Sequence, residues 1–272
     1  MKKGWFIFLL LLVSFLSLGQ TGRGGFYTNR TTGGGGVDYV WGALAWYEFT
    51  NNYNDTYDSN DATPGGNSYV SSNYLDFYES DRNDYINIGD FIPVDCDTIT
   101  VFYEIQFITD DNTTYKECGN TNGGAGNPGW YLAWDGTGTG YFNPIMRGID
   151  NDGTDSYATT VSGGNCVTNI TDDEWHKVAW VLRRNNAASF HWLLFVDGTE
   201  CFASAGDSII SKGGWELFGN DIYFGNSMPG GTGGVADTQY DNLILVRGDA
   251  RYNPDGNLID LYMTDPETML IK

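Results

Sequence analysis

The chain has 272 residues, 41% of them apolar and 15% aromatic, so it can build a large core and wholesale disorder is excluded. Its formal net charge is −21, and such a surface repels nucleic-acid phosphates and anionic membranes. An acidic, asparagine-rich surface suits calcium, neutral glycans or high-salt water, and charge alone does not choose among these partners.

The N-terminus predicts a secretory signal peptide over residues 1–19. Lys2 and Lys3 precede an apolar run over residues 6–18, which is shorter than the roughly 20 residues of an ordinary membrane span. The alternative is an uncleaved N-terminal anchor. Cleavage before Gln20 leaves 12 basic and 35 acidic residues, a net charge of −23. We therefore expect a secreted or cell-surface protein that does not insert into the membrane after cleavage.

Residues 20–36, "QTGRGGFYTNRTTGGGG", are rich in glycine and threonine and show no apolar period. This composition predicts a flexible leader between the signal peptide and the folded part. We expect one domain over residues 37–272, because all-β domains of this length commonly stay single.

From residue 37 onward the sequence predicts strands rather than helices. Short alternating apolar runs are separated by Gly, Asn, Asp and Pro. The only helical candidate is the C-terminal segment 258–272, which suits a turn or a short helix. Many short strands and 37 glycines for turns predict an all-β, two-sheet antiparallel β-sandwich of the jelly-roll type. The expected strands lie at residues 43–49, 98–108, 130–134, 140–149, 177–182, 189–196, 220–226 and 239–248.

Four cysteines in an exported chain favour disulfides, and four cysteines permit three pairings. We favour Cys96–Cys118 and Cys166–Cys201, because each pair brackets neighbouring expected strands. No C-x-x-C spacing is present, so the expected role of the cysteines is to staple the fold rather than to carry chemistry.

The stretch 171–198, "TDDEWHKVAWVLRRNNAASFHWLLFVDG", combines three consecutive acids with both histidines of the chain. A catalytic interpretation needs paired carboxyls on one strand facing a cleft, but these acids precede the apolar strand, where turn residues belong. A histidine such as His176 needs a nucleophile or a metal beside it to act in catalysis. We expect His176 to be a hydrogen-bonded, half-buried residue of the scaffold.

The same stretch carries a family resemblance. "DDEWHKVAWVL" followed by "LLFVDG" resembles the W-H-x-V-A … L-x-V-D-G signature of the concanavalin A-like, laminin-G-like jelly rolls, a group that includes the pentraxins. "WYEFTNNYNDTYDSNDATPGGN", "DFYESDRNDYINIGD" and "QYDNLILVRGDARYN" resemble other strands and loops of that group, so the resemblance spans nearly all of residues 43–263. It implies that Trp175 and His176 end a turn and begin a core strand, and that Asp197-Gly198 forms a tight hairpin turn.

The resemblance also implies a structural Ca²⁺ between the Asp-rich loop after the first strand and an acid on the last strand. The matching positions are Asp58, Asp61 and Asp241, whose hard oxygen ligands suit calcium. The alternative is that the Asp and Asn residues of this loop only form turns.

A carbohydrate site is expected on the hairpin of residues 127–148, "NPGWYLAWDGTGTGYFNPIMRG", which concentrates aromatic and polar residues. If Trp130, Leu132 and Trp134 share one face, they fill the core and leave ligand contacts to the other residues. The expected ligand-binding residues are Tyr131, Asp135, Tyr141, Asn143 and Arg147.

Together these observations predict a non-catalytic recognition module that binds carbohydrate or a surface partner, with calcium as a candidate cofactor. Its partners are expected to be a glycan or a cell or virion surface, and not nucleic acid. One alternative is a structural or assembly protein that uses the sandwich as a scaffold. The other is a polysaccharide hydrolase or lyase, and no glucanase-type acidic motif such as E-x-D-x-x-E supports it. Fold resemblance alone does not decide among these functions.

Overall fold

The computed structural model describes residues 41–57, 59–71, 73–77, 84–93, 95–108, 114–120, 129–135, 143–149, 155–156, 170, 172–186, 189–203, 209–210, 220–225, 237–266 and 269. All of these residues belong to the unit Val37–Lys272. The expected signal peptide and leader lie outside the described residues. Within the described residues, no helix has the length and apolar character needed to cross a membrane.

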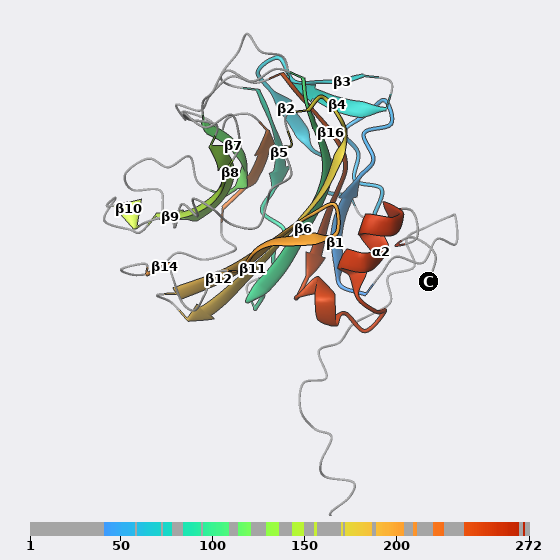
Figure 1. Cartoon of the computed structure of the whole chain (residues 1–272). Coiled ribbons are helices and arrows are strands. Elements are labelled where there is room, and N and C mark those ends of the chain that lie inside the picture. The colour runs from blue at the N-terminus through green and yellow to red at the C-terminus, as the bar shows by residue number, and fades with distance from the viewer. Residues whose placement is uncertain are drawn as a thin grey trace, which may run out of the picture. The chain divides into compact units, whose positions relative to one another are not determined.

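Two antiparallel sheets form the fold (Figure 1). The nine-stranded sheet has the order β13–β12–β11–β6–β16–β4–β3, while β1 pairs with β16 and β14 pairs with β12. Its strands are β1 (Ala43–Tyr47), β3 (Tyr69–Ser71), β4 (Tyr74–Phe77), β6 (Thr98–Phe107), β11 (His176–Asn186), β12 (Ser189–Val196), β13 (Thr199–Ala203), β14 (Ile209–Ile210) and β16 (Thr238–Arg247).

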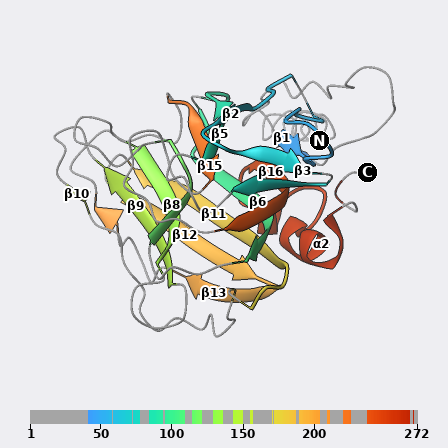
Figure 2. The same cartoon turned by 90° about the horizontal axis from the view of Figure 1, so that it is seen from above.

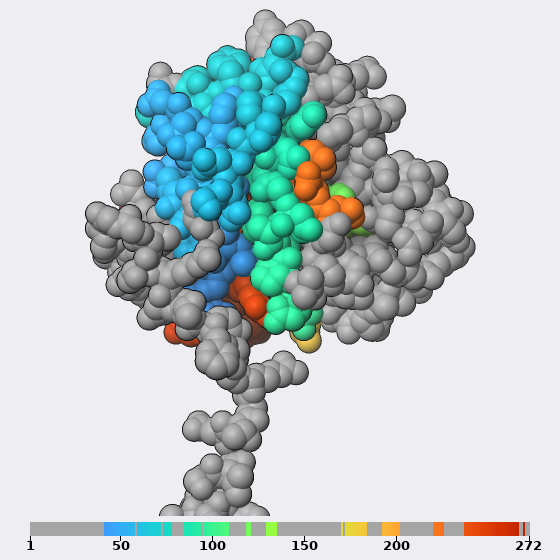
Figure 3. Space-filling view, turned by 180° about the vertical axis from the view of Figure 1, so that it is seen from behind, coloured from blue at the N-terminus to red at the C-terminus, as the bar shows by residue number. Residues whose placement is uncertain are grey.

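The seven-stranded sheet has the order β10–β9–β8–β7–β15–β5–β2. Figure 3 shows β5 in green beside β15 in orange, although the two strands are far apart in sequence. The strands of this sheet are β2 (Thr63–Gly65), β5 (Tyr85–Gly89), β7 (Thr114–Gly119), β8 (Gly129–Asp135), β9 (Asn143–Ile149), β10 (Asp155–Ser156) and β15 (Ile222–Gly225). The prediction of an all-β, two-sheet antiparallel sandwich is confirmed.

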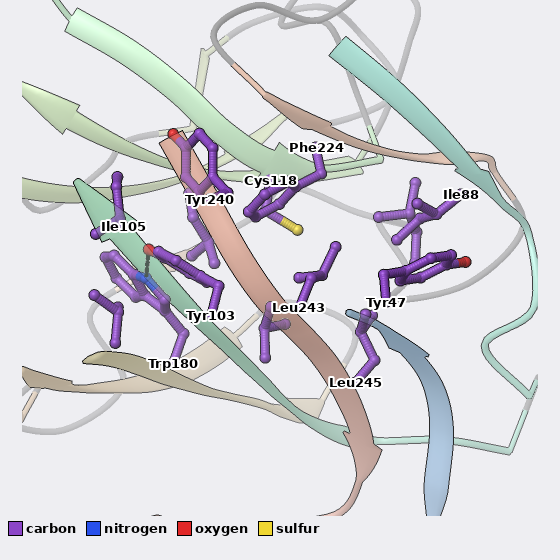
Figure 4. Packing of buried hydrophobic residues seen from close by; sticks show 14 of the residues in the cluster. Tyr47, Ile88, Tyr103, Ile105, Cys118, Trp180, Phe224, Tyr240, Leu243 and Leu245 are labelled. Atoms are coloured by element: carbon purple, nitrogen blue, oxygen red, sulfur yellow. Dashed lines mark hydrogen bonds between the residues drawn. The ribbon is translucent and has the colours of Figure 1, made fainter. Parts of the chain in front are cut away.

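The main core lies between the two sheets, where alternate residues of each strand point inward. Trp130, Leu132 and Trp134 of β8 all belong to it, which confirms that these three residues share the core-facing side. Figure 4 shows part of this core, in which Tyr103 and Tyr240 of the nine-stranded sheet pack around Phe224 of the seven-stranded sheet. The aromatic residues therefore fill the space between the layers.

A second apolar cluster covers part of the opposite, outer face of the nine-stranded sheet. It contains residues of β1, β6, β11, β12 and β16 together with the C-terminal helix α2 (Leu258–Thr264). The Tyr262 ring packs on Phe102 of β6 with 4.8 Å between ring centroids. Figures 1 and 2 show α2 against this sheet. The expected short C-terminal helix is thus present, and it closes one region of the outer face.

Polar contacts hold both ends of α2 in place. The Asn257 side chain accepts a hydrogen bond from the Ile259 amide and caps the helix N-terminus. Lys177 Nζ donates to the carbonyl oxygens of Met263 and Thr264, 3.2 and 3.4 Å away, at the C-terminus. A cation at this end also complements the helix dipole. A 3₁₀ turn, η1 (Ala250–Tyr252), connects β16 to the helix.

The expected hairpin turn at Asp197-Gly198 is confirmed. Val196 and Thr199 pair directly, and the two residues between them have φ angles of +48° and +79°. Positive φ at both central residues is the signature of a type I′ turn, which Asp-Gly sequences favour.

The predicted Cys96–Cys118 disulfide is wrong. Both residues are buried thiols that are not joined to each other. Cys118 lies on β7 of the seven-stranded sheet, whereas Cys96 precedes β6 of the nine-stranded sheet, so strands that neighbour in sequence belong to different layers. Burial raises the pKa of the Cys96 thiol to about 11, which keeps it protonated and inert. Cys166 lies outside the described residues, and its pairing with Cys201 stays a prediction.

Replacement of Tyr103 by Phe tests the polar contact inside the core. The Tyr103 hydroxyl accepts a hydrogen bond of 2.8 Å from Trp180 Nε1, drawn as a dashed line in Figure 4. Tyr103→Phe keeps the ring but leaves the buried indole N–H without this acceptor. We expect the free energy of unfolding to fall by about 1–3 kcal/mol in urea denaturation. Tyr252→Phe, at a 77% exposed position, serves as the control and is expected to leave stability unchanged.

Candidate functional site

His176, the first residue of β11, is held between two carboxylates. Its Nδ1 lies 2.7 Å from Oδ2 of Asp197, and its Nε2 lies 2.9 Å from Oδ1 of Asp172. Asp197 also accepts a hydrogen bond from the Lys177 amide through Oδ1. Because both ring nitrogens are occupied and the residue is only 5% exposed, the imidazole joins the acidic turn to the β12–β13 hairpin. The prediction that His176 is hydrogen-bonded is confirmed, and the residue is buried rather than half-buried.

The charges of this triad support one another. The hydrogen bond with Asp197 raises the pKa of His176, although burial opposes the shift, and Asp172 adds to it. The hydrogen bond with His176 in turn lowers the pKa of Asp172. Burial opposes ionisation of Asp197, but hydrogen bonds from His176 and the Lys177 amide lower its pKa overall. The arrangement therefore favours an imidazolium between two carboxylates.

The acids before β11 act as turn residues. Asp173 has a φ of +66°, in the left-handed region that Asp tolerates better than most residues. Asp172 Oδ1 accepts a hydrogen bond from the Glu174 amide, and Gln106 Nε2 of β6 donates to the Asp173 carbonyl oxygen at 2.7 Å. The expectation that these acids form a turn is confirmed, and Gln106 fastens that turn to the sheet.

The expected calcium ligands are not brought together in the described part of the chain. Asp61 accepts a hydrogen bond from the Asp55 amide, while the carboxyl of Asp241 faces Glu104 and lies near Glu48. Asp58 lies outside the described residues. Among the described residues, no group of three or more His, Cys, Asp or Glu side chains is arranged to hold a metal ion. Because one of the three expected ligands lies outside the described residues, the calcium site that the sequence resemblance implies stays a prediction.

Asp241 instead belongs to a pair of carboxyls on the outer face of the nine-stranded sheet. It pairs in register with Glu104 of β6, at a bulge where the next residue, Asn242, has a φ of +49°. Burial, followed by the charges of Glu104 and Glu48, raises the pKa of Asp241 to about 7. Burial also raises the pKa of Glu104. The charge of Glu104 thus makes ionisation of Asp241 less favourable.

The expected carbohydrate residues lie on neighbouring strands of the seven-stranded sheet. Tyr131 of β8 pairs with Arg147 of β9, and Asp135 pairs with Asn143. Tyr131 is on the side of β8 opposite the core-facing tryptophans, yet it is only 3% exposed. Tyr141 lies outside the described residues. The register brings four of the five residues to one hairpin, but the Tyr131 ring is not open for stacking on a sugar, and their ligand role stays a prediction.

A different surface presents aromatic rings to solvent. It is a row across the outer face of the nine-stranded sheet, in which Tyr69 pairs with Asp76, Asp76 with Gln239, and Gln239 with Gln106. Trp175 continues the row, because His176 pairs with Ile105 and Trp175 is therefore in line with Gln106. We call this row, together with Tyr74, the Trp175 surface. Its residues are Tyr69, Tyr74, Asp76, Gln106, Trp175 and Gln239.

The rings of the Trp175 surface reach over the strands between them. Tyr74 on β4 and Trp175 before β11 are separated by β16 and β6, which corresponds to a backbone separation of about 14 Å at ordinary strand spacing. Their ring centroids nevertheless lie 6.2 Å apart. Trp175 is 40% exposed and Tyr69 is 46% exposed. The surface is thus an aromatic platform with polar side chains between its rings.

Asp76 is the best enclosed polar group of this surface, at 6% exposure. Its Oδ2 accepts hydrogen bonds from the Tyr69 hydroxyl, at 3.0 Å, and from Gln239 Nε2, at 3.4 Å. Its Oδ1 is buried and has no hydrogen-bond partner. Burial raises the pKa of Asp76 despite the two donors. A buried acceptor with an empty position is uncommon in folded proteins and marks a place where a donor fits.

The sequence resemblance assigned Trp175 to the fold and did not single out the other members of this surface. A usable signal is present in "YLDF", where Leu75 and Phe77 face the core and Tyr74 and Asp76 therefore face outward. The signal is weak because β3 and β4 have only three and four residues. Period-two patterns need longer runs to stand out.

Comparison with known proteins shows the fold and no family. Neither a scan against protein-family models nor a search of curated proteins finds a match. Among solved structures, the chain resembles Trypanosoma rangeli sialidase in complex with sialic acid, at 13% identity and a TM-score of 0.56, covering 84% of this chain and 33% of that one. The botulinum neurotoxin type G receptor-binding domain has 11% identity and a TM-score of 0.53, and the match covers 82% of this chain and 51% of that one. The alginate lyase Aly36B in complex with alginate tetrasaccharide has 18% identity and a TM-score of 0.50, and the match covers 77% of this chain and 98% of that one.

The chain therefore spans about a third of the sialidase chain and half of the toxin chain. At such low identity these likenesses show the β-sandwich fold alone.

The His176 triad predicts a specific pH dependence of stability. A raised histidine pKa contributes stability that is fully present below the unfolded value of about 6.5 and is lost as pH rises through the folded pKa. The lowered pKa values of Asp172 and Asp197 contribute stability above about pH 3.9 that is lost at lower pH. We therefore expect His176→Gln to destabilise the protein more near pH 6 than near pH 9.

Urea denaturation of the wild type and of His176→Gln at the two pH values measures this difference. Arg183→Gln, at an exposed position later on β11, controls for loss of a basic residue. An equal loss of stability at both pH values contradicts the charged triad.

Proposed function

We propose that this protein is a secreted, non-catalytic recognition module that binds carbohydrate through the Trp175 surface. The observation that carries this proposal is the exposed row in which Tyr69 and Trp175 flank Asp76, Gln239 and Gln106 on one sheet face. Secretion rests on the signal-like N-terminus. Membership of the laminin-G-like group rests on the order of its sequence motifs.

The chemistry of this surface suits a sugar. A pyranose ring has an apolar C–H face, which stacks on an aromatic ring, and an edge of hydroxyls, which pairs with carboxylates and amides. The Trp175 surface supplies both, because Trp175 and Tyr69 are exposed rings and Gln106 and Gln239 lie between them. Binding sites commonly combine apolar walls with a few placed polar groups. Exposed aromatic side chains that share one face are also a typical mark of interaction sites.

The structural neighbours support a carbohydrate partner only at the level of the fold. Two of them are in complex with carbohydrates, one with an alginate tetrasaccharide and the other with sialic acid. Calcium stays a candidate cofactor of the proposed module, and repeating the binding titration with a chelator measures its contribution.

The Asp241–Glu104 register pair favours the catalytic alternative, a glycoside hydrolase. The two residues lie opposite each other on adjacent strands of one face, and retaining glycosidases use a pair of carboxyls that lie close together. The release of reducing ends from each bound glycan tests this alternative. We expect the wild type to release no more reducing ends than Asp241→Asn does. Release that is present in the wild type and abolished by this substitution would show that the protein is an enzyme.

Replacement of Trp175 by Ala tests the proposed site. We expect a glycan array to identify bound oligosaccharides, and Trp175→Ala to weaken their affinity by roughly tenfold or more in calorimetric titration, because a stacking ring is lost. Tyr252→Ala removes a more exposed aromatic ring elsewhere and is expected to bind as the wild type does. An equal loss of affinity in both variants, or wild-type affinity in Trp175→Ala, would show that the glycan does not bind at this surface. Absence of any glycan binding would favour the structural or assembly alternative.

A further inference from the structure

The Trp175 surface is rich in hydrogen-bond acceptors and negative charge. Asp76 uses Oδ2 for both of its donors, and its buried Oδ1 has no hydrogen-bond partner, so a ligand donor suits this carboxyl better than a ligand acceptor does. The hydroxyl of Tyr69 is already committed to Asp76, and burial together with this hydrogen bond raises its pKa to about 12. Asp76 therefore selects for donors over acceptors.

Acidic residues surround this surface on three strands. Asp172, Asp173 and Glu174 form the exposed turn immediately before Trp175, and Gln106 fastens that turn to β6. Glu104 and Asp241 follow one step further along β6 and β16, on the same face as Gln106 and Gln239. Both of these carboxyls are partly exposed.

Lys177 offsets part of the negative charge on this face, because its charge lowers the pKa of Glu104, although burial raises that pKa overall. Lys177 pairs in register with Glu104, but its Nζ donates to the carbonyl oxygens of Met263 and Thr264 at the end of α2. Its ammonium group is therefore engaged with the helix. The whole chain is also strongly acidic, with a net charge of −21, so the local field and the overall field have the same sign.

We infer that the Trp175 surface recognises amino sugars, whose ammonium group pairs with the carboxylates while the sugar ring stacks on Trp175. This inference rests on the proposed carbohydrate function and names its ligand class. An ammonium group brings three donors and no acceptor, which suits the Asp76 carboxyl, whose Oδ1 has no hydrogen-bond partner. It also gains from charge-assisted hydrogen bonds and from the faces of the tryptophan and tyrosine rings.

The same reasoning separates amino sugars from two other classes. An N-acetylated sugar has hydroxyl and amide donors but no positive charge, so it gains stacking without the electrostatic contribution. A uronic acid polymer adds a carboxylate at each residue and is repelled by Asp76, Glu104 and the acidic turn. The expected order of affinity is amino sugar, then N-acetylated sugar, then uronate.

Oligosaccharides of glucosamine, their N-acetylated counterparts and oligomers of uronic acid provide matched probes for calorimetric titration. We expect the glucosamine oligomers to bind at least about tenfold more tightly than the acetylated ones near neutral pH, because more acidic solutions protonate Asp241, whose pKa burial raises to about 7. This preference is expected to shrink as salt is added, because partly exposed charges are screened.

The variant Asp76→Asn separates the charge from the fold. It keeps an oxygen that accepts from Tyr69 and Gln239 but removes the negative charge and fills the Oδ1 position with an amide. We expect it to lose the preference for glucosamine while it keeps its affinity for the acetylated oligomer. Asp221→Asn removes the same charge from an exposed position beside the seven-stranded sheet, where its Oδ2 accepts from Asn87, and is expected to keep the preference.

The outcomes distinguish this inference from the proposed function. Equal affinity for acetylated and free amines, with both lost in Trp175→Ala, overturns the amino-sugar specificity and leaves the carbohydrate site in place. Glucosamine binding that survives in both Trp175→Ala and Asp76→Asn, and is abolished by salt, shows attraction to the acidic protein as a whole and overturns the inference. No binding of any probe overturns both. A melting curve of Asp76→Asn that matches the wild type shows that the variant is folded, so a change in its sugar preference reports the loss of charge.

Discussion

The docking of α2 on the nine-stranded sheet is the constraint on which the rest of the outer face depends. The inner face of this sheet is covered by the seven-stranded sheet, but its outer face also carries buried apolar residues, including Phe102, Ile244 and Val246. These residues need a cover, and Leu258, Ile259 and Tyr262 provide it. Because a seven-residue helix covers only part of the sheet, the strip along β3, β4 and the ends of β16 and β6 remains open. Lys177 is located at the boundary, since its backbone belongs to β11 and its ammonium caps the helix.

The described carboxyl groups of this protein fall into two sets, one paired with His176 and the other partly buried on the outer face of the nine-stranded sheet. Asp172 in the turn before β11 and Asp197 in the β12–β13 hairpin are neutralised by the imidazole of His176, and their pKa values fall. On the outer sheet face, burial raises the pKa values of Asp76, Glu104 and Asp241, and the charge of Lys177 opposes this shift only in part at Glu104. The first arrangement stabilises the fold, because each group is paired. The second leaves unfavourable burial of carboxyls, which is a common feature of sites that bind a ligand.

Sequence patterns predict the positions of the strands in this fold better than they predict which sheet each strand joins and which outward-facing residues are exposed. Alternation was sufficient for β6, β8, β11, β12 and β16, and it placed Trp130 and Trp134 in the core correctly. It does not report which layer a strand joins, so Cys96 and Cys118 were paired although they belong to different sheets. It also does not report what covers an outward-facing residue, and Tyr131 faces away from the core and is still buried. The short strands β3 and β4 contain too few residues to show a period, so Tyr69, Tyr74 and Asp76 were missed.

The pair Trp175-His176 shows how one motif serves both the fold and the surface. Adjacent residues of an extended chain point to opposite faces. His176 begins β11 on the core-facing side and joins the acidic turn to the hairpin, so Trp175 must point outward, in line with Gln106. The histidine fixes the backbone from which the tryptophan projects, because its two hydrogen bonds hold the start of the strand. A residue that belongs to the scaffold thereby sets the position and direction of a ring that is free to contact a ligand. The stretch that most resembles a structural signature is also the part of the sequence that builds the exposed surface.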